Sequence, residues 1–277
     1  MSEEHQFIDG DLFEGLCNRS YYRDALAELK PEDLLYIESH DVPCLFKRIQ
    51  AEGLSNSFRI LSHNSDATFR ADSSGGLVCH TGLGINPGTC RVDVPRQVLK
   101  WYGQNLDRVN DDRFVSLPIG LERRRWSKGL KHQILAKLST LQVKPECLLY
   151  VNHTGNTNPQ RSGLSEHFSP FTWCHVSPKV SFLDYCVGML KCRFVLSPDG
   201  NGMDCHRSWE ALYLGRIPVM RRTRFHEAVY RDMPVLLVDS FEEISEALLL
   251  RTAQEFTQRN FDLTRLSPDY YRKLVMS

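Results

Sequence analysis

Arg207 and Glu210 lie three residues apart and follow a short segment that holds two glycines, Gly200 and Gly202. If the segment around Arg207 is helical, this spacing puts the guanidinium and the carboxylate on one face of the helix. Glycines let the backbone come close to a ligand, and the first turn of a helix offers amide donors and a positive dipole. Arginine suits a phosphate and glutamate suits vicinal sugar hydroxyls, so the pattern predicts a site for a phosphate that carries a sugar.

The elements that position these side chains can be predicted from the apolar runs on either side. Residues 193–196 and 217–220 are apolar enough to form two buried strands, with a helix between them. Asp204 is the expected N-cap of that helix, Gly215 is its expected C-terminal stop, and Pro218 prevents the helix from continuing. The helix should therefore be short.

A purely structural role is the alternative, because strand-turn-helix units with glycine are common in α/β folds. In that case Arg207 and Glu210 would simply form an ion pair on a helix surface. Polar residues nevertheless crowd the segment between the two strands: Asp199, Asn201, Asp204, His206, Arg207 and Glu210. A structural turn seldom needs so many hydrogen-bonding groups, which favours a ligand site.

Residues 194–219 resemble the donor-site signature of exostosin-like glycosyltransferases of the GT-B type. Residues 100–106, followed by Phe-Val-Ser-Leu-Pro-Ile-Gly-Leu-Glu at 114–122, resemble the first-domain segment of that family. Residues 148–153 and 156–161 are similar to the first strand and loop of its nucleotide-binding domain. The resemblance therefore extends beyond one motif.

The resemblance covers most of residues 58–240 and implies a fold, a reaction and partners. The fold is α/β of the GT-B class, with two Rossmann-like domains whose parallel sheets face a central cleft. The reaction moves a sugar from a UDP-sugar, with UDP-xylose as the leading expectation, to a hydroxyl of an oligosaccharide or N-glycan. It is inverting and needs no metal or other cofactor. In length the chain is most similar to the small exostosin-like enzymes of large algal viruses (chloroviruses), one of which is a xylosyltransferase, so an infected host cell is implied.

The resemblance puts the donor nucleotide on the second domain. Glu210 would hold the ribose, while Arg207, Gly202 and the start of the helix hold the pyrophosphate. Arg161 would offset the charge on the leaving diphosphate, or it is an ordinary arginine of a surface loop. The other expected donor-binding residues are Asn152, His153, Thr154, Asn156, Ser197, Pro198, Gly200, Asn201, Asp204 and His206. The pocket for the nucleotide base would be lined by Phe171, Trp173 and Val176, or these side chains belong to the core.

Sugar transfer without a metal also needs a base that takes the proton of the acceptor hydroxyl. Asp66 is the first candidate, because it follows an apolar strand at 58–62 and inverting transferases usually use a carboxylate; His63 and Asp72 come next. The alternative is that His63 or Asp66 caps the following helix. Residues 9–11, Asp-Gly-Asp, match the manganese-binding pattern of the other major transferase fold in form only, because no strand and loop surround them.

Short strands alternate with helical patterns along the chain, which predicts parallel sheets with helices on their faces. The expected strands are 34–37, 58–62, 78–81, 114–117, 148–152, 193–196, 217–220 and 235–238. The expected helices are 21–29, 43–51, 128–141 and 241–260. We therefore expect an acceptor domain at 1–142, a linker at 143–145 and a donor domain at 146–260, with 261–277 packing back on the first domain. Ligands of such folds bind at the carboxyl ends of the strands.

Composition narrows the classes of protein that remain. The chain has 277 residues, of which 42% are hydrophobic and 25% are charged, an ordinary balance for a globular protein with two domains. A formal net charge of +0 argues against a general nucleic-acid binder, which needs a basic surface. Neither a signal peptide nor a membrane span is visible, so we expect a soluble cytoplasmic protein. The 9 cysteines lack a Cys-x-x-Cys pair, which predicts mostly reduced thiols.

Two other functions compete with the transferase. An oxidoreductase that binds NADP is one, since Gly200 and Gly202 match the first two glycines of the dinucleotide fingerprint and Arg221-Arg222 could bind a 2′-phosphate. Cys205 stands at the third fingerprint position, which weakens this interpretation. The other rival is a noncatalytic module that binds a nucleotide sugar but has no base.

Overall fold

A five-stranded parallel sheet forms the core of the first half of the chain in the computed structural model, which describes residues 6–72, 74, 76–81, 88–107, 111–155 and 157–276. Its strand order is β1-β2-β3-β7-β9. The strands are β1 (Arg19–Ser20), β2 (Leu34–Glu38), β3 (Phe58–His63), β7 (Val98–Gln104) and β9 (Phe114–Leu117). Four consecutive residues of β2 are buried, as expected of a strand that helices cover on both faces.

Helices and short turns of helix connect the strands of this first sheet. α2 (Val42–Ala51) has Pro43 near its start, where the missing amide costs nothing, and it buries Val42, Leu45, Phe46 and Ile49. α1 (Gly10–Gly15) begins after Asp9, whose side chain accepts from the amide of Leu12. The 3-10 turns are η2 (Leu26–Glu28) and η3 (Ser39–Asp41).

The prediction of a helix at 21–29 is wrong. Tyr21 donates its amide to Tyr36 of the neighbouring strand, and the carboxylate of Asp24 accepts from the amide of Ser20. These bonds offer the backbone an alternative to a helix, as Asp and Ser side chains often do. Ala25 is extended, so only η2 is helical in this segment.

A second, mixed sheet lies beside the first, in the order β6-β5-β4-β8. Its strands are β4 (Thr68–Ala71), β5 (Leu77–Thr81), β6 (Gly88–Val92) and β8 (Leu106–Asp107). β4, β5 and β6 pair antiparallel, whereas β4 and β8 are parallel. The strand expected at 78–81 therefore exists, but it belongs to this mixed sheet and not to the parallel one.

The second half of the chain contains another five-stranded parallel sheet, in the order β11-β10-β12-β13-β14. Its strands are β10 (Cys147–Val151), β11 (Cys174–Val176), β12 (Cys192–Leu196), β13 (Ile217–Arg221) and β14 (Leu236–Val238). Four of these were expected from their apolar runs; β11 was not. The two parallel sheets confirm the α/β class.

Helices also accompany the second sheet and lead up to it. Those before and within it are α3 (Arg124–Ser127), α4 (Leu130–Leu138), α5 (Leu164–Phe168), α6 (Phe182–Lys191), α7 (His206–Tyr213) and α8 (Arg224–Val229). Those after it are η5 (Phe241–Glu243), α9 (Glu246–Gln258), η6 (Thr264–Leu266) and α10 (Pro268–Met276). The expected helix at 241–260 thus begins later, because Ser240 and Ser245 each start a separate segment. No helix among the described residues is long and apolar enough to cross a membrane.

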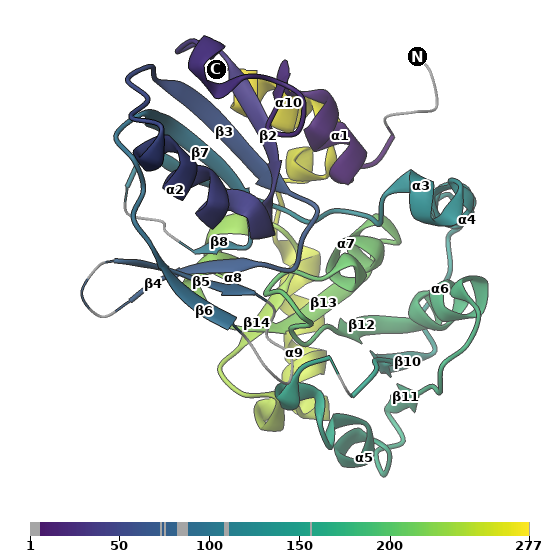
Figure 1. The fold of residues 1–277 in the computed structure, drawn as a ribbon. Helices are drawn as coiled ribbons and strands as arrows, with labels where there is room; N and C mark the ends of the chain where they lie inside the picture. The colour runs from purple at the N-terminus through teal and green to yellow at the C-terminus, as the bar shows by residue number, and fades with distance from the viewer. Residues whose placement is uncertain are drawn as a thin grey trace.

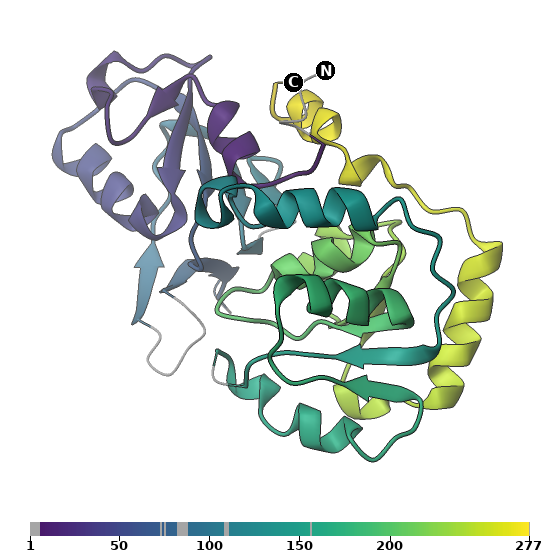
Figure 2. The same ribbon diagram turned by 90° about the vertical axis from the view of Figure 1, so that its right-hand side faces the viewer.

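The arrangement of the two halves can be followed in Figures 1 and 2. β2, β3 and β7 lie apart from β10, β12 and β13, while the yellow C-terminal segment runs from α9 beside the second sheet to α10 beside α1. The ring of Tyr271 on α10 meets that of Phe13 on α1 edge-on, with centroids 5.5 Å apart. One apolar cluster includes Leu12 and Tyr102 from the first half and Trp209 and Met220 from the second, so the halves share a core.

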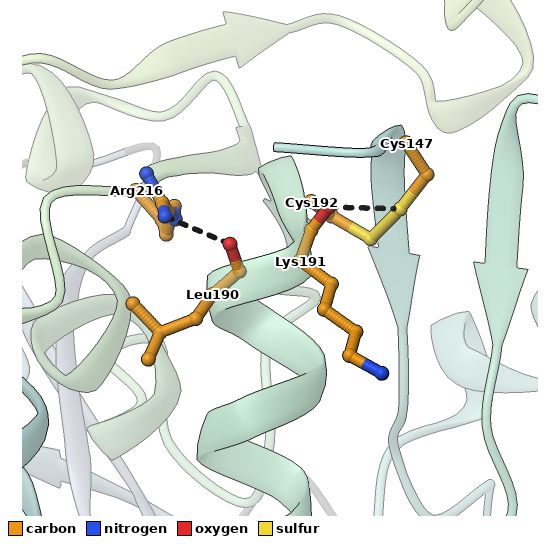
Figure 3. Close-up of a disulfide and its surroundings, with 5 residues drawn as sticks. All are labelled: Cys147, Leu190, Lys191, Cys192 and Arg216. Carbon is orange, nitrogen blue, oxygen red and sulfur yellow. Dashed lines mark hydrogen bonds between the residues drawn. A yellow bond between two sulfur atoms is a disulfide. The ribbon is translucent and has the colours of Figure 1, made fainter. Parts of the chain in front are cut away.

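A disulfide joins the first residues of the neighbouring strands β10 and β12 (Figure 3). Cys147 and Cys192 are direct partners in the register of the two strands, and their Cα atoms are 4.6 Å apart. The other cysteines are free, which agrees with the expectation of mostly reduced thiols: Cys17, Cys44, Cys79, Cys90, Cys174, Cys186 and Cys205. Nearby, Arg216 donates to the carbonyls of Leu190 and Val143 and ties the end of α6 to the segment before β10.

Candidate functional site

The loop between β12 and α7 contains two glycines and approaches the first half of the chain closely. The amide of Gly200 donates to the carbonyl of Gly202 at 3.0 Å. A Cβ atom on Gly202 would lie 2.3 Å from Nδ2 of Asn105, a fully buried side chain in the turn between β7 and β8. Only glycine allows the second half of the chain to approach the first this closely.

Arg161 supports this loop from a neighbouring one. Its Nε donates to the carbonyl of Asp199 at 2.7 Å, and its Nη2 donates to that of Pro198 at 3.0 Å. The side chain is buried, and burial lowers the pKa of the guanidinium below its ordinary value. Arg161 therefore holds the loop in shape through backbone carbonyls, a role that its position in the sequence did not indicate.

A cavity of about 390 Å³ opens at the first turn of α7, and we call it cavity A. Both halves of the chain line it, with Asp66, Ile119, Glu122, Lys131, Asn152, Thr157, Arg161, Phe182, Tyr185, Gly200, Asn201, Gly202, Asp204, Cys205, His206, Arg207 and Glu210. Cys205 is the N-cap residue of α7, and its side chain makes no capping hydrogen bond. The start of the helix therefore faces the cavity without a side-chain cap.

Asp204 is not the N-cap that the sequence predicts. Its carboxylate is buried and accepts from the amide of Ile119 at 2.7 Å, from Nε1 of Trp209 at 3.0 Å and from the hydroxyl of Tyr230. Burial raises the pKa of Asp204, although these hydrogen bonds oppose the rise. Because Ile119 lies in the first half of the chain, Asp204 joins the two halves beside cavity A.

Arg207 and Glu210 both line cavity A, as their spacing predicts. Burial opposes the charge of Arg207, but Tyr185, Cys205 and Glu210 outweigh it and raise the pKa of the guanidinium. The buried Nε of Arg207 has no hydrogen-bond partner among the residues that the structure describes. Glu210 is 6% exposed, and its carboxylate accepts from the hydroxyl of Tyr185 at 2.9 Å. A buried donor without a partner next to a buried carboxylate is what a polar ligand would complete.

Lys131 and Tyr185 are residues of cavity A that the sequence analysis missed. The Nζ atom of Lys131 pairs with the carboxylate of Glu122 and lies 5.1 Å from the ring centroid of Phe182. Lys131 lies on the expected helix at 128–141, and its place on that helix is the signal that could have indicated it. Ser181 accepts from the amide of Asp184 and begins α6, an N-cap pattern that could have revealed the helix carrying Tyr185.

A second cavity of about 390 Å³, cavity B, lies next to cavity A and is lined mainly by the first half of the chain. Its lining residues are Asn64, Ser65, Asp66, Gln104, Ile119, Leu121, Glu122, Arg123, Arg125, Trp126 and His206. Trp126 is 70% exposed, which is unusual for so large an apolar side chain. Four residues line both cavities, namely Asp66, Ile119, Glu122 and His206. The two cavities therefore meet at these residues.

His206 is the first residue of α7 and contacts the first half of the chain. Its Nδ1 lies 2.8 Å from the carbonyl of Gly120. A carbonyl oxygen only accepts, so Nδ1 carries the proton of this bond. The other ring nitrogen, Nε2, takes no part in this bond.

Neither the protein-family models nor the curated proteins that were searched match this chain. The chemistry of the site is therefore inferred from its own side chains. Among the described residues, no group of three or more His, Cys, Asp and Glu side chains is arranged to hold a metal ion. In the formal manganese pattern, Asp9 instead caps α1 and Asp11 pairs with Arg123.

The three predicted bases lie in different surroundings. Asp66 lines both cavities and accepts from Nδ2 of Asn201 at 3.1 Å. His63 is 1% exposed, stacks on Phe13 and lies 2.9 Å from the carbonyl of Pro118, and burial lowers its pKa to about 4. Asp72 accepts from Ser74 and from the amide of Gly76, and these bonds lower its pKa. The linings of the cavities include neither His63 nor Asp72, so the structure does not bring the three together.

The remaining predicted donor residues are divided between cavity A and its supports. Asn152 lines the cavity and donates to the carbonyl of Pro178 at 2.7 Å. His153 lies 3.3 Å from the carbonyl of Arg161, and burial lowers its pKa to about 4. The hydroxyl of Ser197 bonds that of Ser208 below the loop. Those outside the lining of the cavity are His153, Thr154, Phe171, Trp173, Val176, Ser197 and Pro198. Asn156 lies outside the described residues.

Proposed function

We propose that this protein is a glycosyltransferase of the GT-B type that moves a sugar from a UDP-sugar to a hydroxyl of an oligosaccharide or N-glycan. UDP-xylose is the leading donor, and the reaction is inverting, independent of a metal and located in the cytoplasm. The observation that carries the proposal is the pair of cavities that meet at shared residues, one of them at the start of α7. Two adjoining cavities suit a reaction that joins a donor to an acceptor.

The chemistry of cavity A supports a diphosphate of a sugar nucleotide as its ligand. The guanidinium of Arg207 and the positive end of α7 would bind the diphosphate, and Lys131 adds a second cation to the same cavity. These charges would also stabilise the nucleoside diphosphate as it leaves. Gly200 and Gly202 also line this cavity, so the backbone of the loop lies at the proposed diphosphate site.

Glu210 would recognise the ribose of the donor. Its carboxylate is buried, already accepts from Tyr185 and faces the same cavity as Arg207. A carboxylate can accept two hydrogen bonds from vicinal hydroxyls, and a buried one binds them with little competition from water. Cavity B would take the acceptor, since the exposed ring of Trp126 offers an apolar face to a sugar.

An NADP-dependent oxidoreductase is less well supported. Its 2′-phosphate was expected at Arg221 and Arg222, but Arg222 pairs with Asp239 at 3.1 Å and with Glu227 at 3.2 Å. Neither arginine lines cavity A. A noncatalytic binding module differs from the enzyme only in turnover, so an assay must separate these two.

Calorimetric titration of the purified protein with UDP, UDP-xylose, UDP-glucose, GDP-fucose and NADPH tests the proposal, with a chelator present and then with manganese. We expect UDP and at least one UDP-sugar to bind in chelator. Transfer of labelled xylose from UDP-xylose to an oligosaccharide or water would then distinguish an enzyme from a module. Binding of NADPH alone, or binding of UDP only with manganese, would contradict the proposal.

A further inference from the structure

We propose that His206, and not Asp66, accepts the proton of the acceptor hydroxyl during sugar transfer; this inference rests on the proposed function. The reacting oxygen must come from the acceptor and the reacting carbon from the donor. Both atoms therefore lie where cavity A meets cavity B. The titratable residues that line both cavities are Asp66, Glu122 and His206.

The hydrogen bond of His206 fixes which ring nitrogen can act as a base. Nδ1 donates to the carbonyl of Gly120 at 2.8 Å, so the neutral ring has its lone pair on Nε2. The same bond orients the ring, because the carbonyl belongs to the fixed segment after β9. A base needs both properties, a free lone pair and a defined direction.

The two carboxylates at the junction of the cavities are engaged differently. Glu122 pairs with the ammonium group of Lys131, so its carboxylate already has a cationic partner. Asp66 accepts from the amide of Asn201, a residue of the glycine loop, and its side chain is exposed to water. We therefore assign Asp66 as a positioning residue that holds the loop of the second half against the first.

The transfer step follows from these positions. The acceptor hydroxyl gives its proton to Nε2 of His206 as its oxygen forms a bond to the anomeric carbon of the donor sugar. The bond from that carbon to the diphosphate breaks, and its electron pair leaves with the diphosphate. Arg207 and the start of α7 bind the negative charge so formed. The imidazolium of His206 keeps its bond to Gly120 and later releases the proton to water.

Asparagine at position 206 separates the two roles of this histidine. In His206→Asn the amide group can still donate to the carbonyl of Gly120, but it has no basic nitrogen. We expect this variant to fold, to bind UDP within about threefold of the wild-type affinity and to lose about 10²–10⁴-fold in kcat. His206→Ala should show a similar loss, and added imidazole should partly restore its activity with saturation. His40→Asn, which changes an exposed histidine of the first half, is the matched control.

Asp66→Asn provides the comparison with the competing base. Its amide oxygen can still accept from Asn201, so we expect kcat to fall by less than about tenfold. A larger loss in Asp66→Asn than in His206→Asn would overturn the inference, as would kcat of His206→Asn within tenfold of wild type. Loss of UDP binding in His206→Asn would assign the residue to the donor instead. If the wild-type chain transfers no sugar from any UDP-sugar, the proposed function itself fails.

Discussion

At the residue scale, the proposed role of Glu210 in nucleotide binding can be tested by removing its carboxylate. Hydrogen bonds to a charged group contribute about 1.5–3 kcal/mol, which corresponds to roughly ten- to hundredfold in affinity. We therefore expect Glu210→Ala to weaken UDP binding in calorimetry by that factor. Tyr185→Phe removes the hydroxyl that donates to Glu210 and leaves the carboxylate, so its effect should be smaller. Equal affinities of wild type and Glu210→Ala would exclude Glu210 from the ribose site.

His63 should make the folded protein less stable in acid. Burial lowers its pKa from 6.5 to about 4, so the folded protein holds it neutral. Between these values the unfolded chain binds the proton more readily, and stability therefore falls as the pH drops from about 6.5 towards 4. The full effect is up to about 3 kcal/mol.

Urea unfolding at pH 7.5 and pH 5 measures this dependence. His63→Gln lacks the titrating ring, so its free energy of unfolding should fall less between the two pH values than that of wild type. His153, whose pKa is also lowered to about 4, keeps part of the dependence in the variant. Equal acid sensitivity of wild type and His63→Gln would show that His63 makes no contribution. His40→Asn serves as the control for an exposed histidine.

Residue roles were predictable where partners are close in sequence. The three-residue spacing of Arg207 and Glu210 predicted that both line one cavity. Asp204 was predicted as a cap from its place before the expected helix, whereas its partners Ile119 and Tyr230 lie 85 and 26 residues away. Its burial, and that of His63, results from contacts with distant residues that no local pattern records.

At the scale of elements, the disulfide between β10 and β12 leads to a prediction about stability. The two cysteines are 45 residues apart, and closing a loop of this length stabilises a fold by about 2–4 kcal/mol through the unfolded chain. We expect Cys147→Ser with Cys192→Ser to lower the Tm by several degrees in thermal unfolding followed by circular dichroism. A reductant should lower the Tm of wild type and leave that of the double variant unchanged.

Cys174→Ser provides a matched control, because Cys174 lies in the adjacent strand β11 and is free. The control should respond to reductant as wild type does. If reductant fails to lower the Tm of wild type, or lowers that of the double variant equally, the bond does not contribute in the manner described. UDP binding should persist in all of these proteins, because neither cysteine of the bond lines cavity A.

Elements were predictable where burial alone decides them. Apolar runs in the sequence predicted the strands β2, β3, β10, β12 and β13, because these strands are covered on both faces. The hairpin strands β4 and β6 carry mixed polar residues, and β6 is largely exposed, so no run of apolar residues marks them. The segment at 21–29 had a helical pattern, but side-chain bonds of Asp24 and pairing of Tyr21 with Tyr36 override such a local preference.

At the scale of the whole molecule, the two halves are joined beside both cavities. Asp204 accepts from Ile119, His206 donates to Gly120, and the amide of Asp204 donates to Oδ1 of Asn105 at 2.9 Å. The sequence predicted parallel sheets with helices on their faces, yet these contacts depend on how the two halves of the chain pack together. Because one apolar cluster includes residues of both, the halves should unfold together.

The C-terminal segment tests this coupling. Tyr271 on α10 is 2% exposed and packs against Phe13 of α1, and Arg59 of β3 donates to the carbonyl of Val275. Tyr271→Ala leaves a large gap in the shared cluster and should destabilise the protein by about 3–5 kcal/mol. Because that cluster extends into the second half, urea unfolding should remain one transition, shifted to lower urea, when followed by both fluorescence and circular dichroism. Met276→Ala, at an exposed position of the same helix, should unfold as wild type does. Two separate transitions in Tyr271→Ala would mean that the halves are stable independently and that α10 supports the first alone.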